Sequence, residues 1–436
     1  MLQGLQQRAG NAASMLRNIM KYLCSGKCVY LLTRSVFLEK HLLQNAFFAL
    51  KNYGVLYFLQ QVRNKLKTLY FSNIDERCLV APQRLPDKDY AHLTGYLAGY
   101  DPAALPRRVA ICVSSQGNAF MTEIALAIES GLLELSVEAV VLHESDAIDP
   151  GRFDWVLIVA PHEFFSLGTG ERLLGKLGRA DNLLMVNTEQ RQSTWFNMAK
   201  YCFKKARAIL DINYQTAIQL TNEGFLAYFF PIGHSAHYEG RRPPGPLPRH
   251  ELFFHLPETA RQSEYAYADR PIDVLFVGAN SPRRGAFMAA HAGLFRDCET
   301  FFYMPESDVP LQKGDARCLG FEELIGLVRR SKILINIHQG ENNYFEWQRI
   351  VSLGILQKTL VISETCNETP FVEPGRDYVD VPLENLAEQC LYFLAHPEEA
   401  ESRAERAHAR LCSTCRMSEV LGNVFTHCVG NKREFL

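Results

Sequence analysis

The chain has 436 residues, of which 47% are hydrophobic and 22% charged, and its net charge at neutral pH is -2. This composition is typical of globular proteins, and the length suffices for two or three domains that each bury a core. The small net charge gives no reason to expect a nucleic acid partner, and no apolar run reaches the ~18 residues of a membrane span.

Residues 1–75 have the pattern of a basic amphipathic helical region. Leucines and aromatic residues alternate there with ten lysines and arginines, and Glu39 is the only acid before Ser72. A basic amphipathic helix can bind an anionic membrane surface, but a helical subdomain with solvated lysines has the same pattern. The first residues lack the apolar core of a secretory signal. We therefore expect a cytoplasmic protein, either free or peripheral at the inner face of the membrane through residues 1–72.

Two short segments resemble metal-binding motifs without fitting them. The segment CSTC (412–415) is followed by His427 and Cys428, but this spacing does not fit a known zinc finger. The DKD triplet at residues 87–89 matches the D-x-D of some sugar transferases, but it lies in a polar linker and is typical of a solvated turn. The twelve cysteines are scattered, which indicates free thiols in a reducing compartment. We expect no metal site.

Between residues 104 and 240, short apolar runs alternate with segments of helical spacing. The runs include RRVAICVSS, VEAVVLHES, FDWVLIVAP, NLLMVNTEQ, AILDIN and LAYFFPIGH. Strands that alternate with helices predict a parallel sheet covered by helices on both faces.

The same alternation restarts between residues 265 and 425, after the stretch HYEGRRPPGPLPRHE. This stretch is rich in proline, glycine and arginine, as a crossing between domains would be. The second set of strands includes DVLFVG, CETFFYMP, KILINIHQ, KTLVISE and YVDVPL, and a single helix is predicted to close it. The sequence therefore predicts an α/β protein with two Rossmann-like, doubly wound domains facing a cleft, preceded by the helical region.

The first turn of the second domain, VGANSPRRG, is a candidate phosphate site. Ligands of open parallel sheets bind beyond the carboxyl ends of the strands. Here Gly278 ends a strand, Asn280 lies in the turn, and Arg283 and Arg284 begin the next helix. A helix N-terminus with adjacent arginines favours phosphate, although a solvated helix cap gives the same pattern. The absence of G-x-G-x-x-G disfavours a dinucleotide.

The segment KILINIHQGENNYFEWQRIVSLGILQKTLVISE is predicted to form a strand, a helix over NNYFEWQRIVSLGI and a second strand. It places further polar residues at the strand ends and between the strands. These candidates are His338, Glu341, Glu346, Arg349, Ser363 and Glu364. A carboxylate near a helix start, such as Glu346, can accept both hydroxyls of a ribose. Alternatively, Glu346 and Arg349 form a surface ion pair worth only ~0.3–0.5 kcal/mol.

In the first domain, His162 and Glu163 follow the third strand and Glu189 follows the fourth. Each is a candidate catalytic base, and an unperturbed histidine pKa near 6.5 suits proton transfer at neutral pH. A histidine in a P-H-E turn is also often a capping or packing residue. His234, near the predicted crossing between the domains, is a further candidate for lining the cleft.

The segment from INIHQ to LVISE resembles retaining-type glycosyltransferases of the GT-B fold, in particular the group-1 and CgeB-like set. Their signature has two acidic positions separated by seven residues, followed by a helix, a glycine and an apolar strand. Glu346 falls on the second position, His338 stands at the first in place of glutamate, and Gly354 matches the glycine. The turn after DVLFVG is similar to the family's donor phosphate turn. The resemblance extends between Arg107 and Leu411.

This resemblance implies transfer of a sugar from a nucleotide-diphosphate sugar to a glycan, lipid-linked or protein acceptor. The donor would bind the second domain, where Glu346 would hold the ribose and the arginines the diphosphate, so that no cofactor and no obligatory metal are expected. The acceptor would bind the first domain. Two other classes stay open: a sugar-nucleotide epimerase of the same fold, and a non-catalytic module that binds a glycan or a partner. The sequence specifies neither the donor base and sugar nor the stereochemical outcome.

Overall fold

The structure is a computed structural model that describes residues 92–191, 193–239, 265–305 and 319–428, with isolated positions 55, 59, 62, 90, 253 and 256. Apart from three of these positions, the predicted helical region at residues 1–75 lies outside the described residues, as does most of the predicted interdomain stretch. Both sheets belong to one compact unit, within residues 77–190 and 202–436. Helix α8 (Thr194–Phe203) lies mostly in a second unit.

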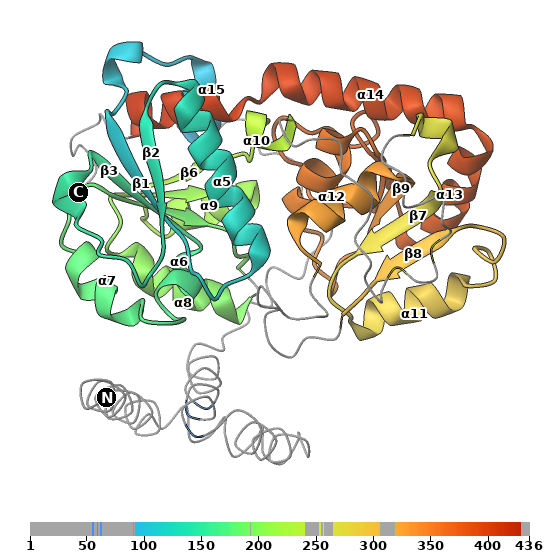
Figure 1. The fold of residues 1–436 in the computed structure, drawn as a ribbon, viewed down its shortest axis with the longest axis horizontal. Coiled ribbons are helices and arrows are strands. Elements are labelled where there is room, and N and C mark those ends of the chain that lie inside the picture. The colour runs from blue at the N-terminus through green and yellow to red at the C-terminus, as the bar shows by residue number, and fades with distance from the viewer. Residues whose placement is uncertain are drawn as a thin grey trace. The chain divides into compact units, whose positions relative to one another are not determined.

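The first sheet has six parallel strands in the order β2-β1-β3-β4-β5-β6 (Figure 1). Its strands are β1 (Arg108–Cys112), β2 (Glu138–Leu142), β3 (Trp155–Val159), β4 (Leu183–Asn187), β5 (Ala208–Asp211) and β6 (Ala227–Phe229). Strand β4, with the sequence LLMVN, is buried along its whole length, whereas the edge strand β2 is partly exposed. Near-continuous apolar runs are what parallel strands need when both faces are covered.

Helix α4 (His92–Gly95) precedes the first sheet, and the other helices of this region follow its strands, as the alternation predicts. They are α5 (Ala119–Glu134), α6 (Pro161–Phe164), α7 (Glu171–Leu177), α9 (Tyr214–Asn222) and α10 (Ala236–Glu239). Asn118 caps helix α5, because its side chain accepts a hydrogen bond from the Phe120 N–H at 3.0 Å. The helix packs on β1, β2 and β3. Asn213 caps α9 in the same way, through the Thr216 N–H at 3.0 Å.

The second sheet has five parallel strands in the order β11-β10-β9-β7-β8. They are β7 (Ile272–Val277), β8 (Thr300–Tyr303), β9 (Ser331–Asn336), β10 (Leu360–Glu364) and β11 (Val379–Val381). The helices are α11 (Pro282–His291), α12 (Phe321–Arg329), α13 (Leu386–Ala395), α14 (Pro397–Thr414) and α15 (Met417–Asn423), with π-helices at Trp347–Gly354 and Val424–Cys428. Helix α12 packs on β9, and α13 and α14 pack on β10.

The prediction that one continuous helix closes the second domain is wrong. The segment is divided at His396 into α13 and α14, and Pro397 is the first residue of α14. Proline has no N–H to donate to the preceding turn, and its fixed φ favours the first position of a helix. The segment predicted as a helix from Asn342 onwards is likewise shorter, because helical structure begins only at Trp347.

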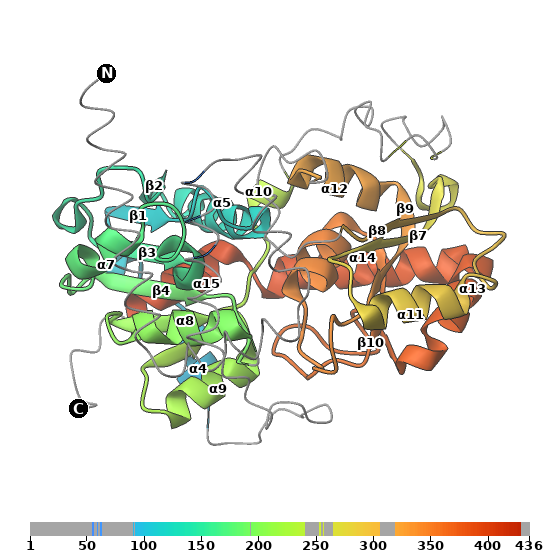
Figure 2. The same cartoon turned by 90° about the horizontal axis from the view of Figure 1, so that it is seen from below.

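The chain after Thr414 returns to the first sheet. The Cys415 carbonyl accepts from the His234 N–H at 2.8 Å, and the Met417 N–H donates to the His234 carbonyl at 2.7 Å. Helix α15 then packs along α5 (Figure 2). Residues 415–425, which were predicted as the end of the second domain, therefore pack against the first sheet region.

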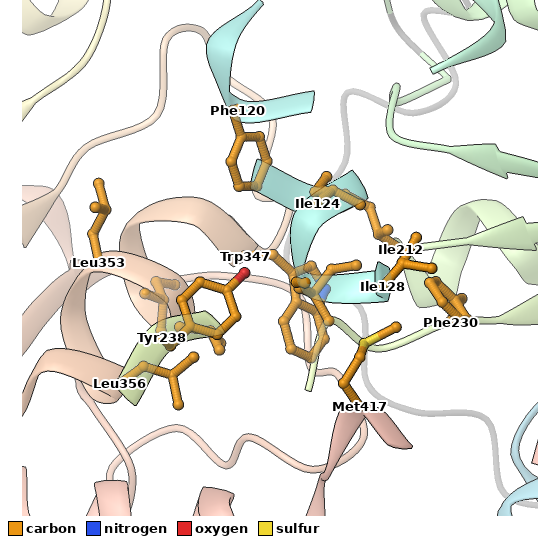
Figure 3. Packing of buried hydrophobic residues seen from close by; sticks show 14 of the residues in the cluster. Phe120, Ile124, Ile128, Ile212, Phe230, Tyr238, Trp347, Leu353, Leu356 and Met417 are labelled. Carbon is orange, nitrogen blue, oxygen red and sulfur yellow. The ribbon is translucent and has the colours of Figure 1, made fainter. Parts of the chain in front are cut away.

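One hydrophobic cluster joins residues of both sheet regions. Figure 3 shows Phe120, Ile124 and Ile128 of α5 in this cluster with Trp347 and Met417. All five are buried. The first and last parts of the described chain thus share a core.

In both sheets the strand order reverses beside the first strand, between β1 and β3 and between β7 and β9. The prediction of two Rossmann-like parallel-sheet domains is confirmed. Such reversal points are where open α/β sheets bind ligands, beyond the carboxyl ends of the strands.

Candidate functional site

The reversal point of the second sheet lies between the ends of β7 and β9. Gly278 follows β7, and His338 follows β9 by two residues. Helix α11 begins a few residues after β7, where the Ser281 hydroxyl accepts from the Arg284 N–H at 3.3 Å. The start of α11 therefore presents its positive end beside the strand tips.

Arg283 lies at the start of α11, close to the ends of strands β7, β9 and β10. Its guanidinium donates two hydrogen bonds, of 2.7 and 2.5 Å, to the carboxylate of Glu364 at the end of β10. The same carboxylate accepts from the main-chain N–H of His338. The Nε atom of Arg283 lies 3.4 Å from Glu341, whose side chain is 81% exposed, whereas that of Glu364 is 5% exposed. The two carboxylates are therefore in very different surroundings.

Arg284 is buried at the same place and binds main-chain oxygens. Its guanidinium donates to the carbonyls of Ile337 at 2.9 Å and Ala279 at 2.7 Å, and it lies 5.3 Å from the ring centre of Phe276. No carboxylate in the described part of the chain forms an ion pair with it. Burial, and then the charge of Arg349, lower the pKa of Arg284 to about 10, so it stays a cation at neutral pH.

Arg349 adds a third guanidinium from the π-helix Trp347–Gly354. It donates to Asn336 at 2.6 Å and pairs with Glu346 at 3.2 Å. The alternative of a surface ion pair is wrong, because the Arg349 and Glu346 side chains are only 6% and 15% exposed. Burial alone would raise the pKa of Glu346, but Arg349 and the Tyr344 hydroxyl lower it below the usual value. Glu346 is thus an ionised acceptor at neutral pH.

Gly278 allows the guanidinium groups of Arg284 and Arg349 to approach each other. A Cβ at this position would lie 3.1 Å from a nitrogen of each and 3.0 Å from the ring of Phe276. Any larger residue would have to displace one of these groups. Sequence reasoning predicted Gly278 as a strand end, and the structure adds this packing reason.

His338 is buried and neutral. Its Nε2 atom lies 3.3 Å from the Thr365 carbonyl and 3.7 Å from the Cys366 sulfur, and its ring is 5.2 Å from that of Tyr344. Burial lowers the pKa of His338, although nearby carboxylates oppose this. Its Nδ1 atom is buried without a hydrogen-bond partner among the described residues, so one polar group in this site is left unsatisfied.

Two predicted residues contribute less directly. Ser363 is fully buried, where it accepts from the Asn336 amide at 2.8 Å and donates to the Glu364 carbonyl at 2.7 Å. Asn280 is exposed, and its N–H donates to the Pro305 carbonyl at 3.1 Å. Ser363 therefore supports the strand ends, and Asn280 borders the turn.

In the first sheet, the predicted residues gather near the end of β3. Ala160 adopts a left-handed conformation, with φ of 50°, which turns the chain sharply into α6. The Nε2 atom of His162 then lies 3.4 Å from Glu189. His162 is 1% exposed, and burial lowers its pKa to about 3. The expected histidine pKa near neutrality is therefore wrong, because the ring has lost its hydration.

Glu163 faces the loop that follows β1. Both its carboxylate oxygens accept from the Asn118 N–H, at 3.2 and 3.0 Å. A Cβ on Gly117 would lie 2.1 Å from one of these oxygens, so the loop can cover the carboxyl group only with glycine there. Burial raises the pKa of Glu163 to about 8, the Asn118 N–H lowers it in part, and Glu189 raises it further.

Sequence reasoning missed several polar groups at the strand ends. Glu144 accepts from the main-chain N–H and the hydroxyl of Ser115, at 2.7 and 2.6 Å. Asp211 accepts from the Asn187 amide at 2.8 Å, and burial raises its pKa to about 8. The available signal was a polar residue that closes or follows an apolar strand, as in VVLHE, LLMVN and AILD. Tyr344 was missed because the predicted helix already included it.

No group of three or more His, Cys, Asp or Glu residues with metal-binding geometry occurs among the described residues. Cys412 lies 3.6 Å from the His408 Nε2 atom, and the His427 Nε2 atom lies 2.7 Å from the Gly99 carbonyl. The DKD triplet lies outside the described residues. None of the helices in the described ranges combines the length and apolarity that a membrane crossing needs.

Protein-family models give no match to the sequence, and a search of curated proteins gives none either. Among solved structures, Anabaena HepE in complex with UDP and glucose matches with 10% identity and a TM-score of 0.45, covering 75% of this chain and 100% of HepE. The T4 phage β-glucosyltransferase with UDP-glucose matches with 10% identity and a TM-score of 0.45, covering 74% and 100%. An α1,3-fucosyltransferase with GDP has 10% identity and a TM-score of 0.43, covering 82% and 96%. The structural neighbours of this chain thus include glycosyltransferases, with a likeness limited to the general arrangement of the chain.

Proposed function

We propose that the protein is a glycosyltransferase that moves a sugar from a nucleotide-diphosphate donor to a glycan, lipid-linked or protein acceptor. The observation that carries this proposal is the group of three guanidiniums, Arg283, Arg284 and Arg349, at the reversal point of the second sheet. Two of them pair with carboxylates, and Arg284 binds only main-chain oxygens among the described residues. Arg284 is therefore a buried cation without a carboxylate among the described residues, at the position where such sheets bind ligands.

A nucleoside diphosphate fits this charge. When the sugar leaves, negative charge develops on the diphosphate, and preorganised guanidiniums stabilise that charge without reorganisation. The start of α11 adds N–H groups and the positive end of the helix dipole. Because Arg284 and the start of α11 supply positive charge for the leaving group, we expect transfer to proceed without an obligatory metal.

Glu346 is assigned to bind the ribose of the donor. Its carboxylate is ionised and therefore only accepts hydrogen bonds, and ribose hydroxyls can donate them. The resemblance of this segment to the glycosyltransferase signature implies the same role. The Nδ1 atom of His338 is unsatisfied nearby, and because the neutral ring uses its Nε2 proton toward the Thr365 carbonyl, Nδ1 would accept a hydrogen bond from a sugar hydroxyl of the donor.

The acceptor is assigned to the carboxyl edge of the first sheet, where Glu163, Glu189 and His162 are the candidate bases. A base works best when its pKa lies near the working pH, and the pKa of Glu163 is about 8. The pKa of His162 is about 3, which makes it a weak base. We therefore assign the proton-accepting role to Glu163 and give His162 the role of orienting Glu189.

The test is calorimetric titration with UDP, GDP, dTDP, ADP and CMP, each with and without magnesium. The wild-type protein should bind one of them, and Glu346→Gln should bind it at least about tenfold more weakly. Glu373→Gln, an exposed substitution in the same sheet region, serves as the matched control and should bind like wild type. Failure of every nucleotide to bind would contradict the proposal.

The bound nucleotide then selects the labelled donor sugar for a turnover assay. Transfer to an added acceptor supports the glycosyltransferase. Conversion of the donor without any acceptor would indicate the epimerase, and binding without turnover would indicate the non-catalytic module.

A further inference from the structure

Arg283 contacts two carboxylates that differ in exposure and in the number and length of their contacts. Glu364 is 5% exposed and accepts two hydrogen bonds from the guanidinium, of 2.7 and 2.5 Å. Glu341 is 81% exposed and makes one longer contact, 3.4 Å from Nε. An incoming anion would affect these two partners differently.

The Glu364 carboxylate is held too firmly to be displaced. Besides Arg283 it accepts the main-chain N–H of His338, and its position at the end of β10 is buried. Removing Arg283 from it would leave a buried charge with one N–H as its partner, which is strongly unfavourable. The bidentate pair therefore persists when a ligand binds, and it fixes the plane and direction of the guanidinium.

The Glu341 carboxylate is the exchangeable partner. It is largely in water, and an exposed ion pair of this kind contributes little because solvent and salt screen it. A phosphate oxygen offers the same acceptor chemistry with more negative charge. It can therefore take the place of Glu341 on the Nε side of Arg283 while Glu364 stays bound.

We propose that Glu364 is a positioning residue that aims Arg283 at an anion, and that Glu341 is a counter-ion which the anion displaces. Both residues then act through Arg283 and neither binds the donor, unlike in the prediction from the sequence. That the anion is the diphosphate of a nucleotide sugar rests on the proposed function. The exchange itself rests only on the contacts of Arg283.

The test uses inorganic pyrophosphate as the probe, titrated by calorimetry into the full-length protein at low salt. Glu341→Gln should tighten pyrophosphate binding about two- to fivefold, because a competing carboxylate is removed. Glu364→Gln should weaken it about tenfold, because Arg283 loses its orientation. Glu373→Gln, which removes an equally negative exposed side chain elsewhere in this sheet region, should leave the affinity unchanged.

The same two substitutions in an Arg283→Gln background separate positioning from a general loss of structure. If both residues act through Arg283, their effects on pyrophosphate affinity should disappear there. A Glu364→Gln effect that persists without Arg283, or a Glu341→Gln variant that does not bind more tightly, would overturn the inference. Circular dichroism at the titration temperature establishes that each variant is folded.

Failure of the inference and failure of the proposed function give different results. Suppose that a nucleoside diphosphate binds in a Glu346-dependent manner, but its affinity changes with neither Glu341→Gln nor Glu364→Gln. The inference is then wrong and the proposed function stands. If pyrophosphate responds as expected but no nucleotide binds more tightly than pyrophosphate, the exchange stands and the nucleotide-sugar function is wrong. Absence of pyrophosphate binding to wild type would contradict the inference, whereas the nucleotide titrations decide the proposed function.

Discussion

The carboxylate of Glu346 lies 3.2 Å from the guanidinium of Arg349, and both side chains are largely withdrawn from water. Arg349 also donates to Asn336 at the end of β9, so the pair anchors the π-helix to the second sheet. Glu346→Gln would leave the Arg349 cation buried without a carboxylate. We expect it to lower the free energy of unfolding by about 2 kcal/mol, measured by urea denaturation at pH 7.

The control for this prediction is Glu373→Gln. Glu373 pairs with Arg376 at 2.7 Å, but the two side chains are 58% and 52% exposed, so the loss should be below about 1 kcal/mol. Because the pKa of Glu346 is lowered on folding, its stabilisation is present above the usual value of 4.5 and is lost as pH falls through the folded value. The difference between wild type and Glu346→Gln should therefore vanish in acid. A difference that persists there would contradict the ionic origin.

The strand ends of this site were predictable, but its contacts were not. Apolar runs identified where β7, β9 and β10 end, so Gly278, His338 and Glu364 could be placed at one sheet edge. The bidentate pair of Arg283 and Glu364 joins residues 81 positions apart, and no local spacing encodes such a pair. Packing of the whole sheet brings them together.

Local geometry also limited the prediction around Glu346. An apolar period near 3.6 residues predicts a helix there, but it does not distinguish an α-helix from the π-helix Trp347–Gly354. Burial of the Glu346–Arg349 pair could not be predicted from the sequence either, since a spacing of three residues fits an exposed pair just as well. The break before Pro397 was visible in the sequence, because proline is favoured at the first turn of a helix.

Asp211 provides a pH-dependent prediction for the first sheet. It is fully buried, and its pKa rises on folding from 3.8 to about 8, mainly through burial. Between these values the folded carboxyl keeps its proton and the unfolded one loses it, so stability should fall as pH rises. The slope is about 1.4 kcal/mol per pH unit.

Asp211→Asn removes this titration and should give a flatter stability profile between pH 4 and pH 8 in urea denaturation. Asp297→Asn is the control, because that carboxylate is 91% exposed and its removal should leave the wild-type slope. Equal slopes for wild type and Asp211→Asn would show that Asp211 is ionised in the folded protein.

Gly117→Ala tests the contact between the loop after β1 and Glu163. The added methyl group would lie 2.1 Å from a Glu163 oxygen, so the carboxyl group or the loop must move. We expect a loss of about 1–3 kcal/mol in the free energy of unfolding. With Glu163→Ala present the clash is gone, and the double variant should lose less than the sum of the single variants.

Gly175→Ala is the matched control for this substitution, since a Cβ there meets no atom within 4 Å. Because Gly175 lies within α7, alanine should stabilise the protein by up to about 1 kcal/mol. Strict additivity of Gly117→Ala and Glu163→Ala would mean that the two positions do not touch.

Met417 tests whether the C-terminal segment is part of the first sheet's core. Its side chain is fully buried, and a Cβ on Gly131 of α5 would lie 2.9 Å from its Cγ atom, so α15 and α5 are closely packed. Met417→Ala should therefore lower the free energy of unfolding by about 2–5 kcal/mol in urea denaturation. Leu133→Ala is a control on α5 itself, because Leu133 is 59% exposed and its loss should change stability by at most about 0.5 kcal/mol. If the two variants unfold at the same urea concentration, the packing of α15 against the first sheet region does not contribute to the free energy of unfolding.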